Sequence, residues 1–586
     1  GPIAALYFYY KQDEEFYEVI NDLERSGKIK LRRSFKVENG HLVQIDSPEG
    51  IFRRTETGWE KLDADSEIAA HRSRGIHAKE KSLPSILSLI TKDQFEMITT
   101  DPERPVIIQG SAGSGKTTVA LHRLAWLLHE NNSTVKSENT RVIVMNKSLA
   151  VYVSATLPSM GIDDVQTTTF NSWALSIIRK SMRTQPFFKF LTIPSFVEEI
   201  KFSEEILKAL DGLVEKQGKA LDEKIKKEFS SRTAHLEGWA KGKGKPILPR
   251  LRDFHHEVKN SKLPEAEKQQ KLGLVKKQIA NQEDYLQDLY NLLSDTEHLK
   301  KYLKRDTKLA SNLEYLKRLT DKNRLKKNLD YFDMSLVLRF IQVKNGGLPD
   351  GDGGTVLLDH IVIDEAQDFG PVEFAIMMDA VRDKHQVTIV GDVAQKILFA
   401  RKFIGWKKVV EYLGLDEDSI IQLEVSFRCT VPIMTLAYKV AGDPKTVEGR
   451  AGPAPDWKKV GNFVDLTEAL ADWSRGLLRA DPYKLVALIC RYPKQAMELK
   501  EEMENYLPGE VRLGHRDQFS FEPGVLVTNI HQVKGLEFDS VALVEPDEEN
   551  YPEKREESRN MIYVGITRTQ EDLLLATIRP YSSVLF

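Results

Sequence analysis

The stretch Gly110-Ser111-Ala112-Gly113-Ser114-Gly115-Lys116-Thr117 matches the pattern GxxxxGK[ST], which is typical of a phosphate-binding loop. The apolar run 106–108 before it predicts a strand, and residues 118–129 after it predict an amphipathic helix. Glycines let backbone N–H groups curl around phosphates, and the N-terminus of the helix adds its positive dipole. We expect Lys116 to reach the β- and γ-phosphates and Thr117 to offer its hydroxyl to Mg²⁺.

A second segment supplies the acids that such a site needs. Residues 361–363 are apolar and predict a strand that delivers Asp364 and Glu365 to its carboxyl end. Asp364 is then placed to hold Mg²⁺, and Glu365 to position or deprotonate the attacking water. An Asp-Glu pair after an apolar strand is a weak signal alone, but together with the phosphate loop it predicts ATP hydrolysis.

Length and composition limit the class of protein. The chain has 586 residues, 41% of them hydrophobic and 29% charged, which favours several globular domains. It holds no apolar run of membrane-spanning length and no secretory signal, and its two cysteines, Cys429 and Cys490, predict a reducing cytoplasm. Gly1-Pro2 resembles a protease-cleavage scar, which is consistent with a fragment of a longer protein.

The patterning divides the chain. Residues 3–30 predict a helix, and turn signals in 31–62 predict β-hairpins. Strands alternate with helices from residue 90, which predicts an α/β fold with parallel sheets. Residues 195–330 are instead charged and helical in period, with 30 Lys and Arg against 21 Asp and Glu in 201–330, and a heptad seam over 272–293 predicts a helical hairpin.

Six ordered motifs together resemble the UvrD/Rep-type superfamily 1 helicases, and more narrowly their HelD/helicase IV branch. The resemblance covers about residues 90–580 and rests on the phosphate loop, the segment DEAQD at 364–368 and four further segments: VGDVAQ at 390–395, LEVSFR at 423–428, TNIHQVKGLEF at 528–538 and YVGITR at 563–568.

The resemblance implies two RecA-like P-loop domains. Residues 86–194 and 331–419 form domain 1A, 195–330 a helical insert similar to 1B, and 420–586 domain 2A, with a 2B domain minimal or absent because only about 35 residues separate the strand at 485–489 from the segment at 528–538. Residues 1–85 remain a small accessory region whose function is not readable.

The resemblance also assigns roles around ATP. It implies that Gln94 reads adenine, Phe427 stacks on it, Glu537 contacts the ribose side and Gln395 senses the γ-phosphate. Gly535, in the same motif as Glu537, is a further nucleotide-binding candidate. Arg428 and Arg568 reach the γ-phosphate from the second domain, where positive charge offsets the charge that develops during transfer. Thr118 stands where related helicases often carry an adenine-stacking arginine, so one face of the base is less firmly held.

The same resemblance implies contacts with a single strand of DNA or RNA, through phosphate contacts and base stacking. The candidate residues are Asn146, Lys147, Thr169, Phe170, Asn171, Thr528 and His531. Phe399 is the nearest candidate for a base-stacking aromatic, with core packing an equal alternative. A basic turn, Lys241-Gly242-Lys243-Gly244-Lys245, is a further candidate for phosphate contact, although its composition favours a solvent-exposed loop.

Three interpretations of function stay open on the sequence. The first is a 3′→5′ DNA translocase or helicase. The second is a HelD-like factor that engages RNA polymerase through the 195–330 insert and remodels it with ATP. The third is the motor subunit of a nuclease or defence complex.

Overall fold

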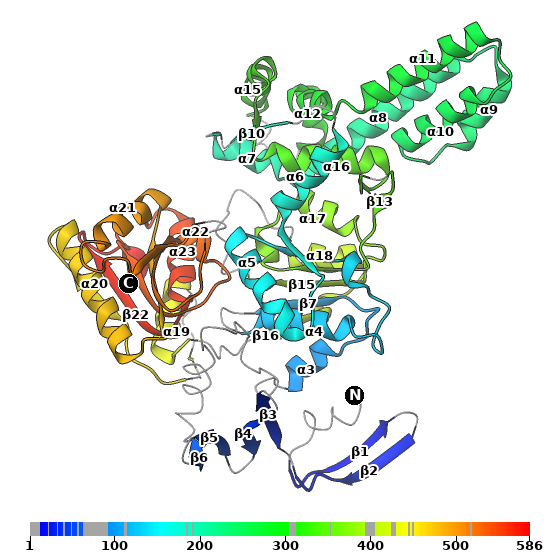
Figure 1. Ribbon diagram of the computed structural model, residues 1–586. Helices are drawn as coiled ribbons and strands as arrows, with labels where there is room; N and C mark the ends of the chain where they lie inside the picture. The colour runs from blue at the N-terminus through cyan, green and yellow to red at the C-terminus, as the bar shows by residue number, and fades with distance from the viewer. Residues whose placement is uncertain are drawn as a thin grey trace.

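The computed structural model describes residues 12–20, 23–31, 33–38, 41–47, 50–55, 58–62, 92–110, 114–182, 186–189, 191, 193–303, 312–351, 353–392, 405–423, 429–442, 446–447, 450–515 and 519–586. Its centre consists of two α/β units, each built on a six-stranded sheet (Figure 1). Every pairing within these two sheets is parallel. The predicted α/β fold class with two parallel sheets is therefore confirmed.

The first sheet has the order β16-β7-β15-β14-β8-β9. Its strands are β7 (Val106–Gly110), β8 (Thr140–Val144), β9 (Gln166–Thr169), β14 (His360–Ile363), β15 (Val387–Gly391) and β16 (Ile420–Leu423). The helices of this unit are α3 (Lys92–Ile98), α4 (Lys116–Leu127), α5 (Lys147–Thr156), α6 (Phe170–Ser181), α16 (Asp333–Asn345), α17 (Pro371–Met378) and α18 (Trp406–Leu413).

The second sheet has the order β17-β22-β21-β18-β20-β19. Its strands are β17 (Asp456–Lys459), β18 (Leu485–Cys490), β19 (Val511–Leu513), β20 (Gly524–Asn529), β21 (Phe538–Val544) and β22 (Thr569–Thr577). The helices of this unit are α19 (Val431–Ala441), α20 (Phe463–Ala480), α21 (Pro493–Met503), α22 (Ile530–Val533) and α23 (Glu556–Ile566).

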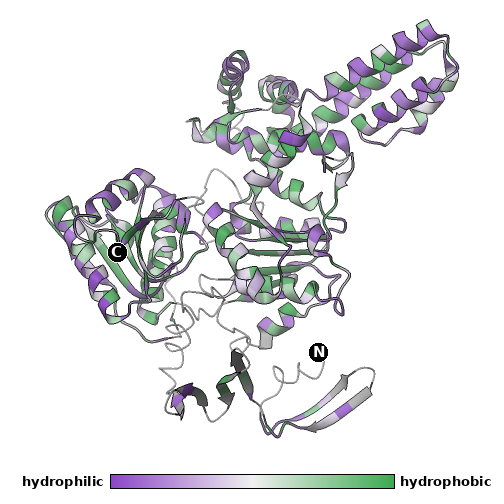
Figure 2. Cartoon of the chain, in the orientation of Figure 1, coloured by the Kyte–Doolittle hydropathy of each residue, from purple (hydrophilic) through white to green (hydrophobic). Residues whose placement is uncertain are grey.

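Both faces of each sheet are buried, which explains why the central strands are continuous apolar runs. On β7, Ile107 packs into one hydrophobic cluster while Val106 and Ile108 pack into another. On β18, Val486 and Leu488 face one cluster and Ala487 and Ile489 the other. Figure 2 shows the apolar strands enclosed between helices in both units. The interiors of these strands are therefore closed to solvent, and ligands of such sheets bind outside the carboxyl ends of the strands.

The helical insert projects from the first unit as an arm (Figure 1). It contains α7 (Ser195–Lys201), α8 (Glu204–Glu228), α9 (Thr233–Lys241), α10 (Ile247–Lys259), α11 (Glu265–Gln282), α12 (Tyr285–Ser294), α13 (Thr296–Leu303) and α15 (Leu313–Lys326). The outer part of the arm has its own hydrophobic cluster around Phe229, Trp239 and Phe254, whereas the inner part shares the main cluster of the first unit.

Buried ion pairs fix the base of the arm to the first unit. Lys201 bonds to Asp330 and lies 2.6 Å from Asp333, and all three side chains are buried. Lys344 on α16 lies 2.5 Å from Asp288 on α12. Because a buried charge without its partner is strongly destabilising, these pairs favour one orientation of the arm on the sheet.

The predicted heptad seam over residues 272–293 is not one helix. The helix α11 ends at Gln282, and Asp284 caps the start of α12 by accepting from the Gln287 N–H. Leu272 then packs in the outer cluster and Leu289 in the inner one. The break between α11 and α12 follows from the capping residue Asp284, which the apolar spacing does not reveal.

The N-terminal part is β-structured. The predicted helix over residues 3–30 is wrong where the structure describes it, because β1 (Glu15–Ile20) and β2 (Leu23–Lys28) form an antiparallel pair. Residues 1–11 lie outside the described part. The hairpins predicted for 31–62 are present as a four-stranded sheet of β3 (Ser34–Glu38), β4 (His41–Ser47), β5 (Gly50–Thr55) and β6 (Gly58–Leu62).

Three smaller observations concern the predicted organisation. The strand β16 pairs with β7 in the first sheet, although its residues were assigned to the second domain. Between β18 and β20, the described residues form α21 and β19 of the second unit and no separate inserted domain. Among the helices that the structure describes, none combines the length and apolar character needed to cross a bilayer.

Candidate active site

The phosphate loop connects β7 to α4, as its sequence predicted. Gly115 precedes the helix with a φ of 82°, a left-handed conformation that favours glycine. A Cβ on Gly110 would lie 2.6 Å from the Leu423 carbonyl oxygen of β16, so the close approach of these strands requires glycine there. Ser111, Ala112 and Gly113 lie outside the described residues, and the Ser114 hydroxyl is buried with no hydrogen-bond partner in the described part of the chain.

Lys116 and Thr117 begin α4 and point toward the strand ends. The Lys116 Nζ donates to the Gly110 carbonyl oxygen at 2.9 Å and is buried. The Thr117 hydroxyl donates to Asp364 Oδ2 at 2.9 Å, across 247 positions of sequence. The structure thus brings together the phosphate loop and the acidic segment that the sequence paired only by motif. The roles of these residues stay predictions.

The two acids after β14 are crowded. Burial raises the pKa of the Asp364 carboxyl to about 7, and the neighbouring Glu365 adds to the rise. Burial also raises the pKa of Glu365, but Lys534, Lys116 and Arg568 outweigh it and leave that pKa below its ordinary value. A hydroxyl and a carboxylate oxygen 2.9 Å apart, beside a second carboxylate, are a set of ligands that Mg²⁺ prefers. The residues present therefore fit this ion.

Gln94 lies against the phosphate loop from helix α3. Its Nε2 donates to the Ser114 carbonyl oxygen at 3.4 Å, and the side chain is buried. Arg123 on α4 holds this helix in place, because its guanidinium donates to the carbonyl oxygens of Met97, Ile98, Thr100, Asp101 and Arg104 at the end of α3 and beyond it. Arg123 was not among the site residues predicted from the sequence. A charged residue on the apolar side of a predicted helix was the available signal.

The segment after β20 reaches the acids from the second unit. The Lys534 side chain has no exposed surface, bonds to Asp368 and lies 3.4 Å from Glu365 Oε2. The Lys534 carbonyl accepts from Asn146 Nδ2 at 3.1 Å, and the Ser148 hydroxyl donates to Gln532 at 2.9 Å. The two units therefore meet at the candidate catalytic acids. Lys534 lies in the motif at residues 528–538, but it was not among the residues predicted for the ATP site.

The other nucleotide candidates of the second unit lie near this contact. Arg568 is buried and donates to the Val564 and Leu536 carbonyl oxygens, both at 3.1 Å, while its charge lowers the pKa of Glu365. Gly535 has a φ of 81°, and a Cβ there would lie 2.7 Å from Leu149 of the first unit. Glu537 accepts from Gln570 Nε2 at 2.9 Å.

Besides Ser111, Ala112 and Gly113, four more predicted site residues lie outside the part of the chain that the structure describes, namely Gln395, Phe399, Phe427 and Arg428. Their roles therefore stay predictions. Thr118 is half-buried in the first turn of α4.

The nucleic-acid candidates divide into accessible and buried residues. Asn146 caps α5 through its contact with the Leu149 N–H at 2.7 Å, and Lys147 is exposed. Asn171, at the start of α6, is half-buried. Their position at the carboxyl ends of β8 and β9 suits ligand contact, because ligands of parallel sheets bind there.

Three of these candidates are committed to internal packing in this conformation. Thr169 caps α6 by accepting from the Ser172 N–H at 3.2 Å. Phe170 is buried in edge contact with Trp173. Thr528 has no exposed surface and donates its hydroxyl proton to the Gly514 carbonyl oxygen at 2.8 Å. Direct base or phosphate contact by Phe170 and Thr528 does not agree with this geometry.

His531 belongs to a polar cluster that the sequence analysis missed. Its Nε2 lies 3.2 Å from an Arg491 guanidinium nitrogen, and burial, followed by the Arg491 charge, lowers the His531 pKa to about 4. The Arg491 guanidinium also lies 4.6 Å from the ring centre of the exposed Tyr492. Both residues directly follow β18, so their place after an apolar strand was a usable signal.

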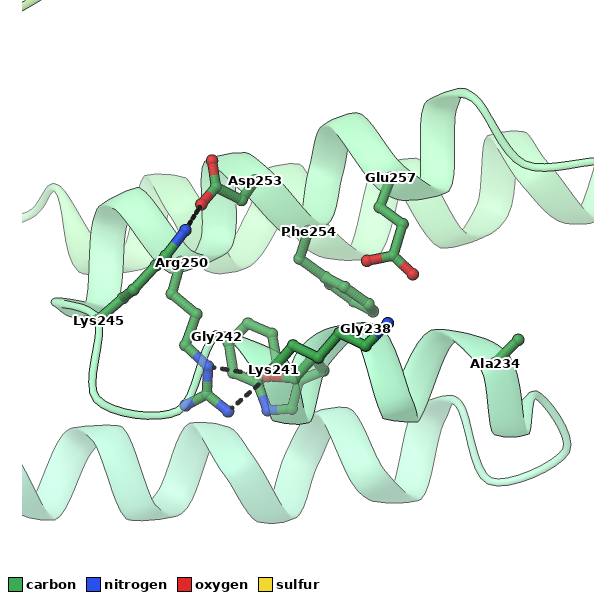
Figure 3. A pocket seen from close by; sticks show the side chains of 10 residues that line it. Ala234, Gly238, Lys241, Gly242, Lys245, Arg250, Asp253, Phe254 and Glu257 are labelled. Atoms are coloured by element: carbon green, nitrogen blue, oxygen red, sulfur yellow. Dashed lines mark hydrogen bonds and ion pairs between the residues drawn. The ribbon is translucent and has the colours of Figure 1, made fainter.

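A hollow of about 310 Å³ lies in the arm and shares no residue with the phosphate loop (Figure 3). Its lining includes Gly238 of α9, Gly242 directly after that helix, and Arg250 and Glu257 of α10. The Arg250 guanidinium lies 3.7 Å from the Trp239 ring centre and bonds to the Trp239 carbonyl oxygen. These contacts hold the two helices together.

Comparison with known proteins gave two family matches. Residues 90–401 match the UvrD/REP helicase N-terminal domain, and residues 483–580 match the UvrD-like helicase C-terminal domain. No curated protein matched the chain. One solved structure, the C-terminal domain of a possible DNA helicase from Lactobacillus plantarum WCFS1, is similar at 23% identity over 28% of this chain and 92% of that chain. The TM-score of this match is 0.24.

Proposed function

The chain belongs to the UvrD/Rep-like helicase family, and from this premise we propose that it is an ATP-driven motor that moves along single-stranded nucleic acid. The finer proposal is a DNA translocase of 3′→5′ polarity, because the resemblance of its motifs is to helicases of that type. ATP is the proposed substrate and Mg²⁺ the proposed cofactor.

The contact between the two units carries this proposal. Lys534 of the second unit bonds to Asp368 and lies 3.4 Å from Glu365, directly beside the phosphate loop of the first unit. A change in the distance between the units must therefore alter the surroundings of Glu365. This is the arrangement that coupling of hydrolysis to domain motion requires, since a ligand shifts an equilibrium only through contacts that differ between its states.

The proposed chemistry assigns one task to each residue. Lys116 binds the β- and γ-phosphates, and Glu365 accepts the proton of the attacking water. Gln395, Arg428 and Arg568 recognise the γ-phosphate and offset its developing charge. Thr117 and Asp364 would hold Mg²⁺, which when bound neutralises phosphate charge. Gln94 is placed to select adenine, and Glu537 to contact the ribose.

The proposed path of the strand crosses the carboxyl ends of both sheets. In the first unit, Asn146 and Lys147 follow β8. In the second, Tyr492 offers an exposed ring and Arg491 and His531 a polar cluster. Aromatic rings that stack on bases and basic groups that contact phosphates are the usual means of holding a single strand.

The decisive experiment measures the steady-state ATPase rate with and without single-stranded DNA or RNA. We expect stimulation by a single strand, and we expect Lys116→Ala to lose at least about a hundredfold of the rate, because Lys116 contacts the transferring phosphate. Lys219→Ala, which changes an exposed lysine paired with Glu215 on the arm, is the matched control and should keep the wild-type rate. Turnover retained in Lys116→Ala would remove the ATPase proposal itself.

The arm supports an alternative proposal. Its outer hydrophobic cluster is separate from the main cluster, so the arm can present a rigid surface to a protein partner. In that case the chain would bind RNA polymerase and remodel it with ATP, or would serve as the motor of a nuclease or defence complex. An ATPase rate that does not change with single-stranded nucleic acid, together with co-purification with core polymerase, would favour the first of these alternatives.

A further inference from the structure

We propose that Gln367 is a positioning residue that fixes the Glu365 carboxylate for hydrolysis and connects it to the end of strand β15. This inference rests on the proposed ATPase function. It extends that function because Gln367 touches neither of the predicted Mg²⁺ ligands through its side chain and was not among the predicted site residues.

Gln367 lies in the turn that directly follows the catalytic acids. Glu365 has a φ of 55°, a left-handed conformation that is uncommon for a residue with a side chain. The chain then forms a single helical turn over Ala366–Asp368. This turn folds the Gln367 side chain back toward Glu365, and Gln367 has no exposed surface.

The orientation of the Gln367 amide is determined by its partners. Its Oε1 accepts from the backbone N–H of Asp392 at 2.9 Å. A backbone N–H can only donate, so the amide oxygen must face Asp392 and the NH₂ group must face the other way. There the Nε2 donates to Glu365 Oε2 at 2.5 Å. Gln367 can therefore present only a donor to the carboxylate, which is the correct partner for an ionised acid.

A glycine on the neighbouring strand independently supports this role. Gly391 ends β15, and a Cβ at this position would lie 2.6 Å from Gln367 Oε1. The φ of Gly391 is not in the left-handed region, so backbone conformation does not explain the glycine. Space for the Gln367 amide does explain it.

The two contacts form a short connection between strands. Residues 393–404, which include the predicted γ-phosphate contact Gln395, directly follow Asp392. A displacement of the Asp392 N–H is passed to the Gln367 amide and from it to the Glu365 carboxylate. Because Gln367 and Lys534 both contact Oε2, the carboxylate is held through one oxygen, and among the described residues no side chain donates to its Oε1. We assign this second oxygen to the attacking water.

Two substitutions separate the two contacts. The Gln367→Glu side chain, when it is ionised, keeps an acceptor for the Asp392 N–H but cannot donate to Glu365, whereas Gln367→Met loses both bonds at similar volume. We expect both variants to lower kcat about tenfold to a hundredfold at saturating ATP and single-stranded DNA, with KM for ATP and nucleotide affinity within about threefold of wild type. Gln287→Met, at an exposed glutamine on α12, should behave as wild type.

A double-variant cycle tests whether Gln367 acts through Glu365. In a Glu365→Gln background, Gln367→Met should change kcat by less than about twofold, because residues that act as a unit are not additive. Additive losses, a kcat within threefold of wild type in both single variants, or unfolding of both variants would overturn the inference. A wild-type protein without ATPase activity would instead overturn the proposed function.

Discussion

At the scale of single residues, the buried His360 should make the free energy of unfolding depend on pH. It has no exposed surface, and burial, followed by the Arg123 charge, lowers its pKa from 6.5 to about 3. The unfolded chain therefore binds one proton more than the folded chain between these values, and stability is lost as pH falls from about 6.5 toward 3. We expect His360→Gln to reduce the slope of the unfolding free energy between pH 6 and 4 by about 1.4 kcal/mol per pH unit.

Urea unfolding at pH 6, 5 and 4 measures this slope. Glutamine can keep the contact that His360 Nε2 makes with the Thr388 hydroxyl at 3.0 Å, so the variant should still fold at pH 7. His129→Gln, at an exposed histidine, is the control and should leave the slope unchanged. An unaltered slope in His360→Gln would show that His360 is not the group that takes up the proton.

Motif spacing could predict which residues meet at the phosphate site, but not what holds them. The contact of Thr117 with Asp364 follows from the requirement that phosphate loop and acids serve one ligand. The partners of Lys534 and Arg123 could not be predicted, because a sequence does not show which carbonyl or carboxylate oxygen a long side chain reaches. Thr528 and Phe170 were assigned to nucleic acid by resemblance, although their hydrogen bond and packing are internal.

At the scale of elements, Arg123 connects two helices of the nucleotide site. Its guanidinium donates hydrogen bonds to five carbonyl oxygens at and beyond the end of α3, the helix that carries Gln94. Lysine has one compact ammonium group and cannot reproduce this fork. We expect Arg123→Lys to raise KM for ATP about fivefold to tenfold, a loss of about 1 kcal/mol in binding, with kcat within twofold of wild type.

The control for this measurement is Arg382→Lys, which changes an exposed arginine paired with Asp359. The ratio of ATP to GTP turnover should fall in Arg123→Lys only, because Gln94 is the proposed adenine contact. An unchanged KM would mean that α3 keeps its place without the guanidinium.

The prediction of elements succeeded where buried strands are continuous apolar runs and failed at β1, where charged and apolar residues are mixed. The strands around Val106, Ile361 and Leu485 carry continuous apolar runs that only two-sided burial explains. The segment Glu15–Ile20 shows neither a continuous apolar run nor a strict alternation of apolar and polar residues. It forms a strand because it pairs with Leu23–Lys28. Secondary-structure propensity, which is a local property, does not predict this pairing.

At the scale of the whole molecule, Lys534 joins the two units. Removing its charge takes the Lys534 ammonium group away from the buried acids Asp368 and Glu365. We expect Lys534→Met to lower the free energy of unfolding by about 3 kcal/mol, because breaking one side of a buried ion pair costs more than the pair contributes. Adding Asp368→Asn should restore part of that loss, since it removes one uncompensated charge.

Denaturant unfolding of the wild type, both single variants and the double variant gives the coupling energy of this pair. Lys484→Met, at a half-buried lysine paired with Asp572 inside the second unit, is the matched control for loss of an ion pair that does not join the units. A double variant as unstable as the sum of the two single variants would contradict a contact between Lys534 and Asp368.

The pairing of β16 with β7 also has a consequence for synthesis of the protein. Ile420 lies beside Ile107, so the first sheet closes only after roughly 300 further residues have left the ribosome, about 15 to 60 seconds at usual rates of translation. The arm, by contrast, is made of neighbouring helices with local contacts and can fold before β16 is synthesised. During that interval the apolar edge of β7 is open to chaperones and to aggregation, and a slowed ribosome would prolong its exposure.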